Sequence, residues 1–139
     1  MSRSGYTDDL DDNWELVRWR GAVASAIHGK RGQALLRDLL AALDAMPEKR
    51  LISGELVTAK GEVCALGAVA CARGISVSHI DPTDYEAVAE AFDISEALAR
   101  EIENENDEYS TTPENRWKAM HEWTMRQLRR GDSETEGVA

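Results

Sequence analysis

The chain has 139 residues, of which 26 are Asp or Glu and 16 are Lys or Arg, and its formal net charge is -10. This length fits one domain with a single hydrophobic core. The longest uncharged run, residues 63–72, is far shorter than the ~20 apolar residues that span a bilayer, and the N-terminus lacks a signal-peptide pattern, so the sequence predicts no membrane contact. Cys64 and Cys71 are too far apart on one predicted helix to form a disulfide, and we therefore expect a cytoplasmic protein.

Helical spacing of apolar residues dominates the first third of the chain. A first helix should begin near Asp12, because Asp12 followed by Glu15 is typical of a helix start, and should end at Gly29. A second helix should follow the turn 29–32 and stop at Pro47, and the two helices should pair as an antiparallel hairpin. Their apolar faces comprise Leu16, Trp19, Val23 and Ile27, then Leu35, Leu36, Leu39, Leu40, Leu43 and Met46.

The middle of the chain predicts one sheet element and one buried helix. Residues 55–64 resemble a small β-hairpin turned at Gly61. Residues 64–72 are almost wholly small or apolar, which favours a central buried helix that Gly74 ends.

Three further helices should start at capping residues, namely Asp81, Ser95 and Thr112. The fold class is therefore mainly α, a single compact helical domain of about six helices with one small β-hairpin. We expect this single domain, residues 1–139, to have an ordered core over about residues 11–130 and flexible, polar termini at residues 1–9 and 131–139.

One acidic stretch accounts for the whole net charge. Residues 81–108 contain a single base, Arg100. Within it, residues 87–102 have the apolar spacing of a helix-turn-helix, but their carboxylates would repel phosphates, so we expect no direct DNA binding. The eleven acidic residues of the stretch are Asp81, Asp84, Glu86, Glu90, Asp93, Glu96, Glu101, Glu103, Glu105, Asp107 and Glu108.

The negative electrostatic field of this acidic stretch attracts a protein partner with a basic surface. The predicted contact residues are Glu96, Glu101, Glu105 and Glu108. The last helix carries several bases, and if it docks beside the acidic stretch it neutralises part of this charge within the chain. The sequence leaves the oligomeric state open.

Catalytic and metal-binding patterns are weak in this sequence. His28, His79 and His121 stand in no spacing that specifies a triad or a zinc site. A calcium-loop register over residues 103–114 lacks the initial Asp and the turn glycine, so no metal and no cofactor is expected. A non-enzymatic protein is therefore the first hypothesis.

Two alternatives to simple protein binding follow from individual residues. Asn106 continues the inward face of its predicted helix, so its amide must find hydrogen-bond partners, either as a structural bracket or as a ligand contact. The first alternative is accordingly a small-molecule or enzymatic pocket around Cys64, Asn106, Asp107 and His121. The second is a DNA-mimic inhibitor, which requires carboxylates spaced like phosphates along one face.

Three elements together resemble a family of uncharacterised small proteins from bacterial, prophage and phage genomes. They are Gly-Glu-Val-Cys-Ala-Leu-Gly-Ala at residues 61–68, Asn-Asp-Glu at 106–108 and Thr-Pro-Glu-Asn-Arg-Trp at 112–117. The resemblance spans about residues 19–128; it implies a common helical fold and brings no functional residues with it. The genomic setting suggests an accessory protein that inhibits or modulates a host system such as antiviral defence.

Overall fold

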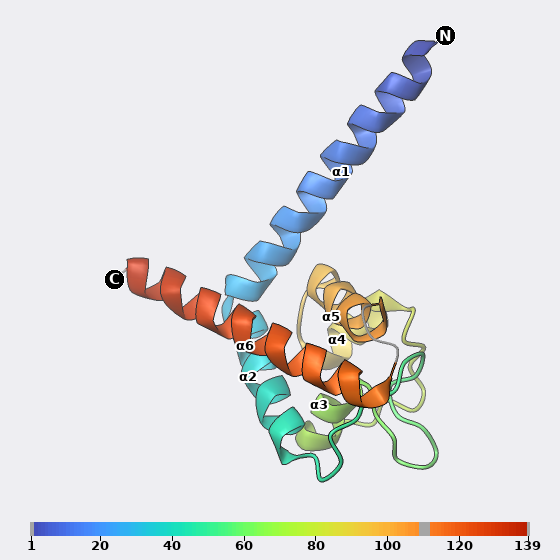
Figure 1. Ribbon diagram of the computed structural model, residues 1–139, viewed down its shortest axis with the longest axis vertical. Coiled ribbons are helices and arrows are strands. Elements are labelled where there is room, and N and C mark those ends of the chain that lie inside the picture. Colours follow the sequence, from blue (N-terminus) through green and yellow to red (C-terminus); the bar gives the residue numbers. More distant parts are fainter. Residues whose placement is uncertain (1, 109–111, 139) are drawn as a thin grey trace.

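The computed structural model describes the backbone of residues 2–108 and 112–138, and the side chains of residues 14–107 and 112–128. Within these ranges the structure is mainly α, as predicted, and contains six helices (Figure 1). These are α1 (Ser2–His28), α2 (Lys30–Ala45), α3 (Ala65–Arg73), α4 (Tyr85–Phe92), α5 (Glu96–Glu108) and α6 (Pro113–Val138).

The core forms around α3, the buried helix that the small residues predicted. Residues 65–70 of α3 are all buried, and α2 and α5 pack against this helix. The long helix α6 lies across α2 and α5, while the C-terminal half of α1 packs on α5. The largest fully buried apolar side chains are Phe92, Leu35, Leu36, Leu39, Leu43, Leu51, Leu98, Ile102, Met120, Val69 and Val88. None of the helices in the described part of the chain is long and apolar enough to cross a membrane.

Most predicted helix ends are confirmed by their capping contacts. Ser95 Oγ accepts a hydrogen bond from Leu98 N–H, and Thr112 Oγ1 accepts one from Asn115 N–H, both at 3.1 Å. Gly74 ends α3 in the left-handed conformation (φ 70°), which glycine adopts at no steric cost. The helix predicted to begin at Asp81 instead begins at Tyr85, because the Asp81 carboxylate closes a turn on Thr83 and Asp84 takes the capping position.

The predicted β-hairpin over residues 55–64 is wrong. In the described residues only one antiparallel bridge, between Val57 and Val63, is formed, and no strand extends from it. Thr58 N–H donates to the Glu62 carbonyl (2.9 Å) and Cys64 N–H to the Leu56 carbonyl (3.1 Å), one on each side of this bridge. The pairing goes no further because Cys64 already caps α3, which begins at Ala65.

The predicted antiparallel pairing of α1 with α2 is also wrong. Only Gly29 separates the two helices, and Figure 1 shows α1 running away from the body of the protein instead of folding back along α2. The expected four-residue turn does not form, because Gly32 lies inside α2, where its missing side chain admits the backbone of Ala26. α1 starts at Ser2 and α6 extends to Val138, beyond the predicted ends of the ordered core, and the flexibility of the termini stays a prediction.

The close approach of α3 to the preceding loop yields a test. A Cβ on Gly67 would lie 1.8 Å from the carbonyl oxygen of Leu56, a backbone atom that has no side-chain freedom to move away. We expect Gly67→Ala to lower the free energy of unfolding by about 3 kcal/mol, as overpacking of a tight core does. Urea denaturation measures this loss. The control is Gly21→Ala on α1, where a Cβ meets no atom within 4 Å; it should be neutral or stabilise by up to ~1 kcal/mol. Equal effects of the two changes would contradict the steric argument.

Candidate functional site

Asn106 is a buried polar residue that joins three separate segments of the core. It lies in the last turns of α5, is 2% exposed, and bonds through both ends of its amide. Ala65 N–H at the start of α3 donates to Oδ1 (3.0 Å), and Nδ2 donates to the Ile52 carbonyl (2.9 Å) and to Asp107 Oδ1 (2.7 Å). Both N–H donors of the amide and one lone pair of its oxygen are thus used inside the protein, which is the arrangement of a structural bracket.

Cys64 lies next to this bracket and caps α3. Its Sγ accepts a hydrogen bond from Gly67 N–H (3.4 Å). Burial raises the pKa of the Cys64 thiol to about 12, and the backbone hydrogen bonds only partly oppose this shift. The thiol is therefore protonated at neutral pH and has no nucleophilic character.

The space beside Cys64 and Asn106 is very small. Its volume is about 10 Å³, and it is enclosed by residues of the loop before α3, by Pro82 and by one face of α5. This is room for about one water molecule. His121 does not line it. The structure therefore brings Cys64, Asn106 and Asp107 together, and places the fourth residue of the predicted pocket elsewhere.

The carboxylates of Glu103 and Asp107 are among the groups that line this space. Glu103 is half-buried, and its pKa is raised to about 7, first by burial and then by the negative charges of Asp107 and Asp81. The same two α5 carboxylates help raise the pKa of the Tyr85 hydroxyl, after the effect of burial. In the part of the chain with described side chains, no group of three or more His, Cys, Asp or Glu is arranged to hold a metal ion.

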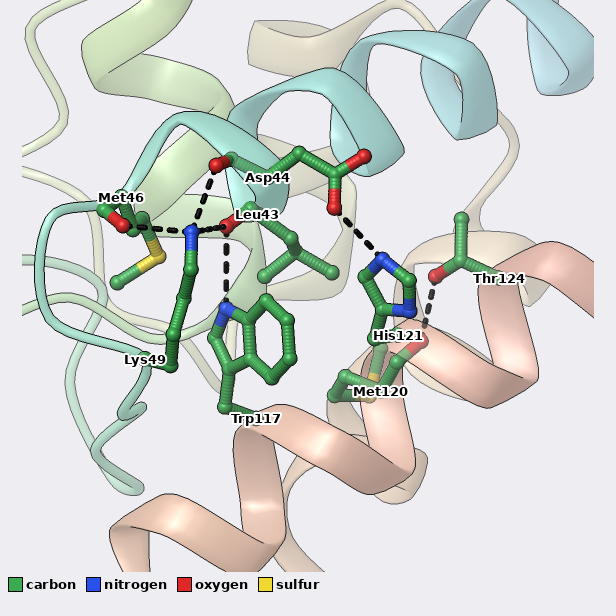
Figure 2. Close-up of polar contacts among 8 residues, drawn as sticks. All are labelled: Leu43, Asp44, Met46, Lys49, Trp117, Met120, His121 and Thr124. Carbon is green, nitrogen blue, oxygen red and sulfur yellow. Dashed lines mark hydrogen bonds and ion pairs between the residues drawn. The ribbon is translucent and has the colours of Figure 1, made fainter.

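His121 lies at a second polar cluster, where α6 crosses the end of α2 (Figure 2). Its Nε2 is 2.7 Å from Asp44 Oδ1, and its ring stacks on Trp117 with centroids 4.8 Å apart. Trp117 Nε1 donates to the Leu43 carbonyl (3.2 Å). Lys49 Nζ donates to the carbonyls of Leu43, Asp44 and Met46 and lies 5.3 Å from the Trp117 ring centroid.

This second cluster satisfies the C-terminal carbonyls of α2 with cationic and aromatic donors, which is a common way to end a helix. Lys49 gives the cluster its positive charge, in the position that the helix dipole favours. The sequence offered no signal for the pairing of Asp44 with His121, because 77 residues separate them. In the structure the cluster holds α6 on α2.

The predicted partner-binding glutamates do not share one face. Glu96 is exposed at the start of α5, whereas Glu101 and Glu105 are half-buried. Glu101 faces α1 and lines a groove of about 490 Å³ between α1, α5 and α6, together with Arg20 and Asn104. Glu101 is five positions after Glu96, so the two side chains point in directions roughly 140° apart around the helix axis. The side chain of Glu108 lies outside the described residues.

A different set of carboxylates is exposed on the acidic stretch. Arg100, its single base, lies over the rings of Trp19 and Tyr85, 5.3 and 5.5 Å from their centroids, and thus links α5 to α1 and to α4. The exposed acidic side chains among the described residues of this stretch are Asp81, Asp84, Glu86, Glu90, Asp93 and Glu96. We call these six residues the acidic surface.

Comparison with known proteins assigns the chain to a family. Residues 30–133 match the family of unknown function DUF6197, and the chain belongs to this family. No curated protein and no solved structure shows a significant similarity to the chain. The family carries no assigned activity, and the phage or prophage setting stays a prediction.

The role of Asn106 as a bracket can be measured. Asn106→Leu keeps the side-chain volume but leaves the Ala65 amide and the Ile52 carbonyl without their buried partner, so we expect a loss of about 2–4 kcal/mol in the free energy of unfolding. Urea denaturation measures it. The control is Asn104→Leu on the groove side of α5, which should cost less than ~1 kcal/mol. A mild effect at position 106 would show that the bracket contributes little.

Glu103 should make stability depend on pH. Its pKa is about 7 in the folded protein against an ordinary value of 4.5, so the folded state retains a proton that the unfolded chain has released. The stabilisation that the protonated Glu103 gives the folded state is complete below pH 4.5 and is lost as the pH rises through about 7. Because Glu103 is partly exposed, we expect Glu103→Gln to be only about 1 kcal/mol more stable than the parent at pH 8, with no such gain at pH 4.

Thermal unfolding at a series of pH values checks this expectation. The control is Glu90→Gln, a neutralised glutamate of the acidic surface, which should shift stability by the same small amount at pH 6 and pH 8. A gain for Glu103→Gln that is as large at pH 4 as at pH 8 would show that packing, and not ionisation, is responsible.

Proposed function

We propose that the protein acts by binding another protein, whose basic surface meets the carboxylates of α4 and α5. The observation that carries this proposal is the exposure of the acidic surface. Among the described residues, only one member of that surface has an ion pair, the 3.2 Å contact of Asp93 with Arg31. The other five carboxylates present their charge to solvent, and a long-range field of this sign steers a cationic partner.

Among the described side chains of α6, residues 113–128, no basic residue forms an ion pair with the acidic surface. Arg116 is buried and donates to the Leu51 carbonyl (2.8 Å). Lys118 and Arg126 are exposed, and among the ion pairs of the described residues none joins them to a carboxylate of α4 or α5. The described part of the last helix therefore gives no sign of the shielding that the sequence left open.

The enzymatic alternative receives less support. A space of about 10 Å³ beside Cys64 and Asn106 admits no substrate, and the Cys64 thiol is protonated at neutral pH. His121, the fourth residue of that pocket, bonds to Asp44 on another side of the molecule. Binding through a surface is the function that these features favour.

The class of partner follows from the charge and from the sequence resemblance. A strongly acidic surface selects a protein that exposes Lys and Arg, such as one that itself binds nucleic acid. From this acidic surface and the expected phage or prophage setting, we propose that the protein is an accessory protein that inhibits or modulates a host system. Antiviral defence is the example to test first.

Charge reversal tests the proposal. A partner is first captured from bacterial lysate by the parent protein, identified by mass spectrometry and purified. In titrations with this purified partner, the triple variant Glu86→Lys, Glu90→Lys and Glu96→Lys should bind at least tenfold more weakly than the parent. The affinity of the parent should also fall steeply with salt, because exposed charges are screened.

The matched control reverses three exposed glutamates outside the acidic surface, Glu48, Glu55 and Glu62. It changes the net charge by the same amount and should retain the partner. Equal losses in both triple variants would point to net charge alone, and unchanged capture by the first would refute the proposed surface. Circular dichroism of each variant verifies its fold.

A further inference from the structure

The groove between α1, α5 and α6 contains polar side chains that the fold leaves without partners. Its volume is about 490 Å³, within the range of about 300–1,000 Å³ that is usual for ligand sites. Four of the polar residues that line it are Arg20 of α1, Glu101 and Asn104 of α5, and Gln127 of α6. Among the residues with described side chains, none of these four has a side-chain hydrogen bond or an ion pair.

Gln127 differs from the other three because it is buried. It is only 8% exposed, and it lines the groove. A buried amide whose donors and acceptor are unpaired costs the folded state free energy. The buried amide of Asn106, by contrast, makes three hydrogen bonds inside the protein. This contrast indicates that the Gln127 amide serves a ligand and not the fold.

The length of the groove favours an extended ligand. One face of α1 lines it from Leu16 to His28, a distance of about 18 Å at ~1.5 Å per residue. An extended peptide rises about 3.3 Å per residue, so about five residues match this length. The walls are apolar enough to receive apolar side chains, since they include Leu16, Trp19, Val23, Ala24, Ile27 and Trp123.

A peptide also complements the polar groups of the groove. Each peptide unit offers one N–H and one carbonyl, which pair with the acceptor and the donors of Asn104 and Gln127. Arg20 and Glu101 line the same groove, and no ion pair of the described residues joins them. A segment that carries one acidic and one basic group satisfies both charges.

A nucleotide fits the groove less well than a peptide. A base needs an open aromatic face, but Trp123 is 4% exposed and Arg100 lies over the Trp19 ring, 5.3 Å from its centroid. A phosphate would be attracted by Arg20 and repelled by Glu101, which lines the same groove. Adenosine monophosphate is therefore the competing ligand in the test.

We propose that this groove binds an extended segment of about five residues from another protein, with apolar side chains and one residue of each charge. Asn104 and Gln127 pair with its backbone, and Arg20 and Glu101 pair with its charged groups. None of the six residues of the acidic surface lines the groove, so the groove is a second site that binds its ligand independently of that surface.

Selection from a displayed library of random pentapeptides tests the proposal on the full chain. The parent should enrich apolar peptides that carry an acidic and a basic residue. A synthetic peptide of the enriched sequence should change the tryptophan fluorescence on titration, because Trp19 and Trp123 line the groove. Gln127→Leu with Asn104→Leu should weaken its binding at least tenfold. The control is Asn115→Leu, which removes an exposed amide at the start of α6 and should bind the peptide as the parent does.

Three outcomes of the selection would overturn the proposal. They are no enrichment by the parent, enrichment of purely basic peptides, which fit the acidic surface, and equal peptide affinity of the parent and the double variant. A fluorescence change with adenosine monophosphate that Gln127→Leu abolishes, without peptide enrichment, would assign the groove to a nucleotide instead.

Stability separates a ligand group from a structural one. Because the Gln127 amide has no partner in the free protein, Gln127→Leu should raise the urea midpoint of unfolding while it weakens peptide binding. Asn106→Leu is the matched contrast, since it removes an amide that the fold uses and should lower the midpoint. A lower midpoint for Gln127→Leu would show that the fold itself holds this amide, and would overturn its assignment to a ligand.

Discussion

The amide of Asn106 is the interaction on which the rest of this fold depends. It joins the end of α5 to the start of α3 and to the loop at Ile52, in a core that offers few other polar contacts. The same loop is tied to α6, since Leu51 N–H donates to the Pro113 carbonyl and the Leu51 carbonyl accepts from Arg116. Unpaired buried amides and carbonyls are costly, so these bonds fix how four separate segments meet. The contact of Gly67 with the Leu56 backbone then closes the packing around α3.

This bracket also explains why the region around Cys64 is a core and not a pocket. The Asn106 side chain, the cap of α3 and the walls of the small cavity use the polar groups that a ligand would need. Glu103 shows the cost of placing an acidic stretch against such a core, because its ionisation is opposed by burial and by Asp107 and Asp81. The remaining carboxylates of α4 and the start of α5 stay in water, where their charge is available to a partner.

The acidic surface comprises exposed carboxylates of α4, of the residues that flank it and of the start of α5. Binding through this surface relies on charge, which gives fast and salt-dependent association.

The sequence by itself determined most of the helices, because apolar spacing and capping residues such as Ser95, Thr112 and Gly74 act locally. It also determined the acidic stretch and the inward position of Asn106. Tertiary structure alone decided what these features meet. Residues 55–64 had the local pattern of a hairpin, but only one bridge forms, because α3 begins directly after Cys64. The exposure of Glu96, the partial burial of Glu101 and Glu105, and the separation of His121 from Cys64 depend on contacts between residues distant in the chain, which no local pattern encodes.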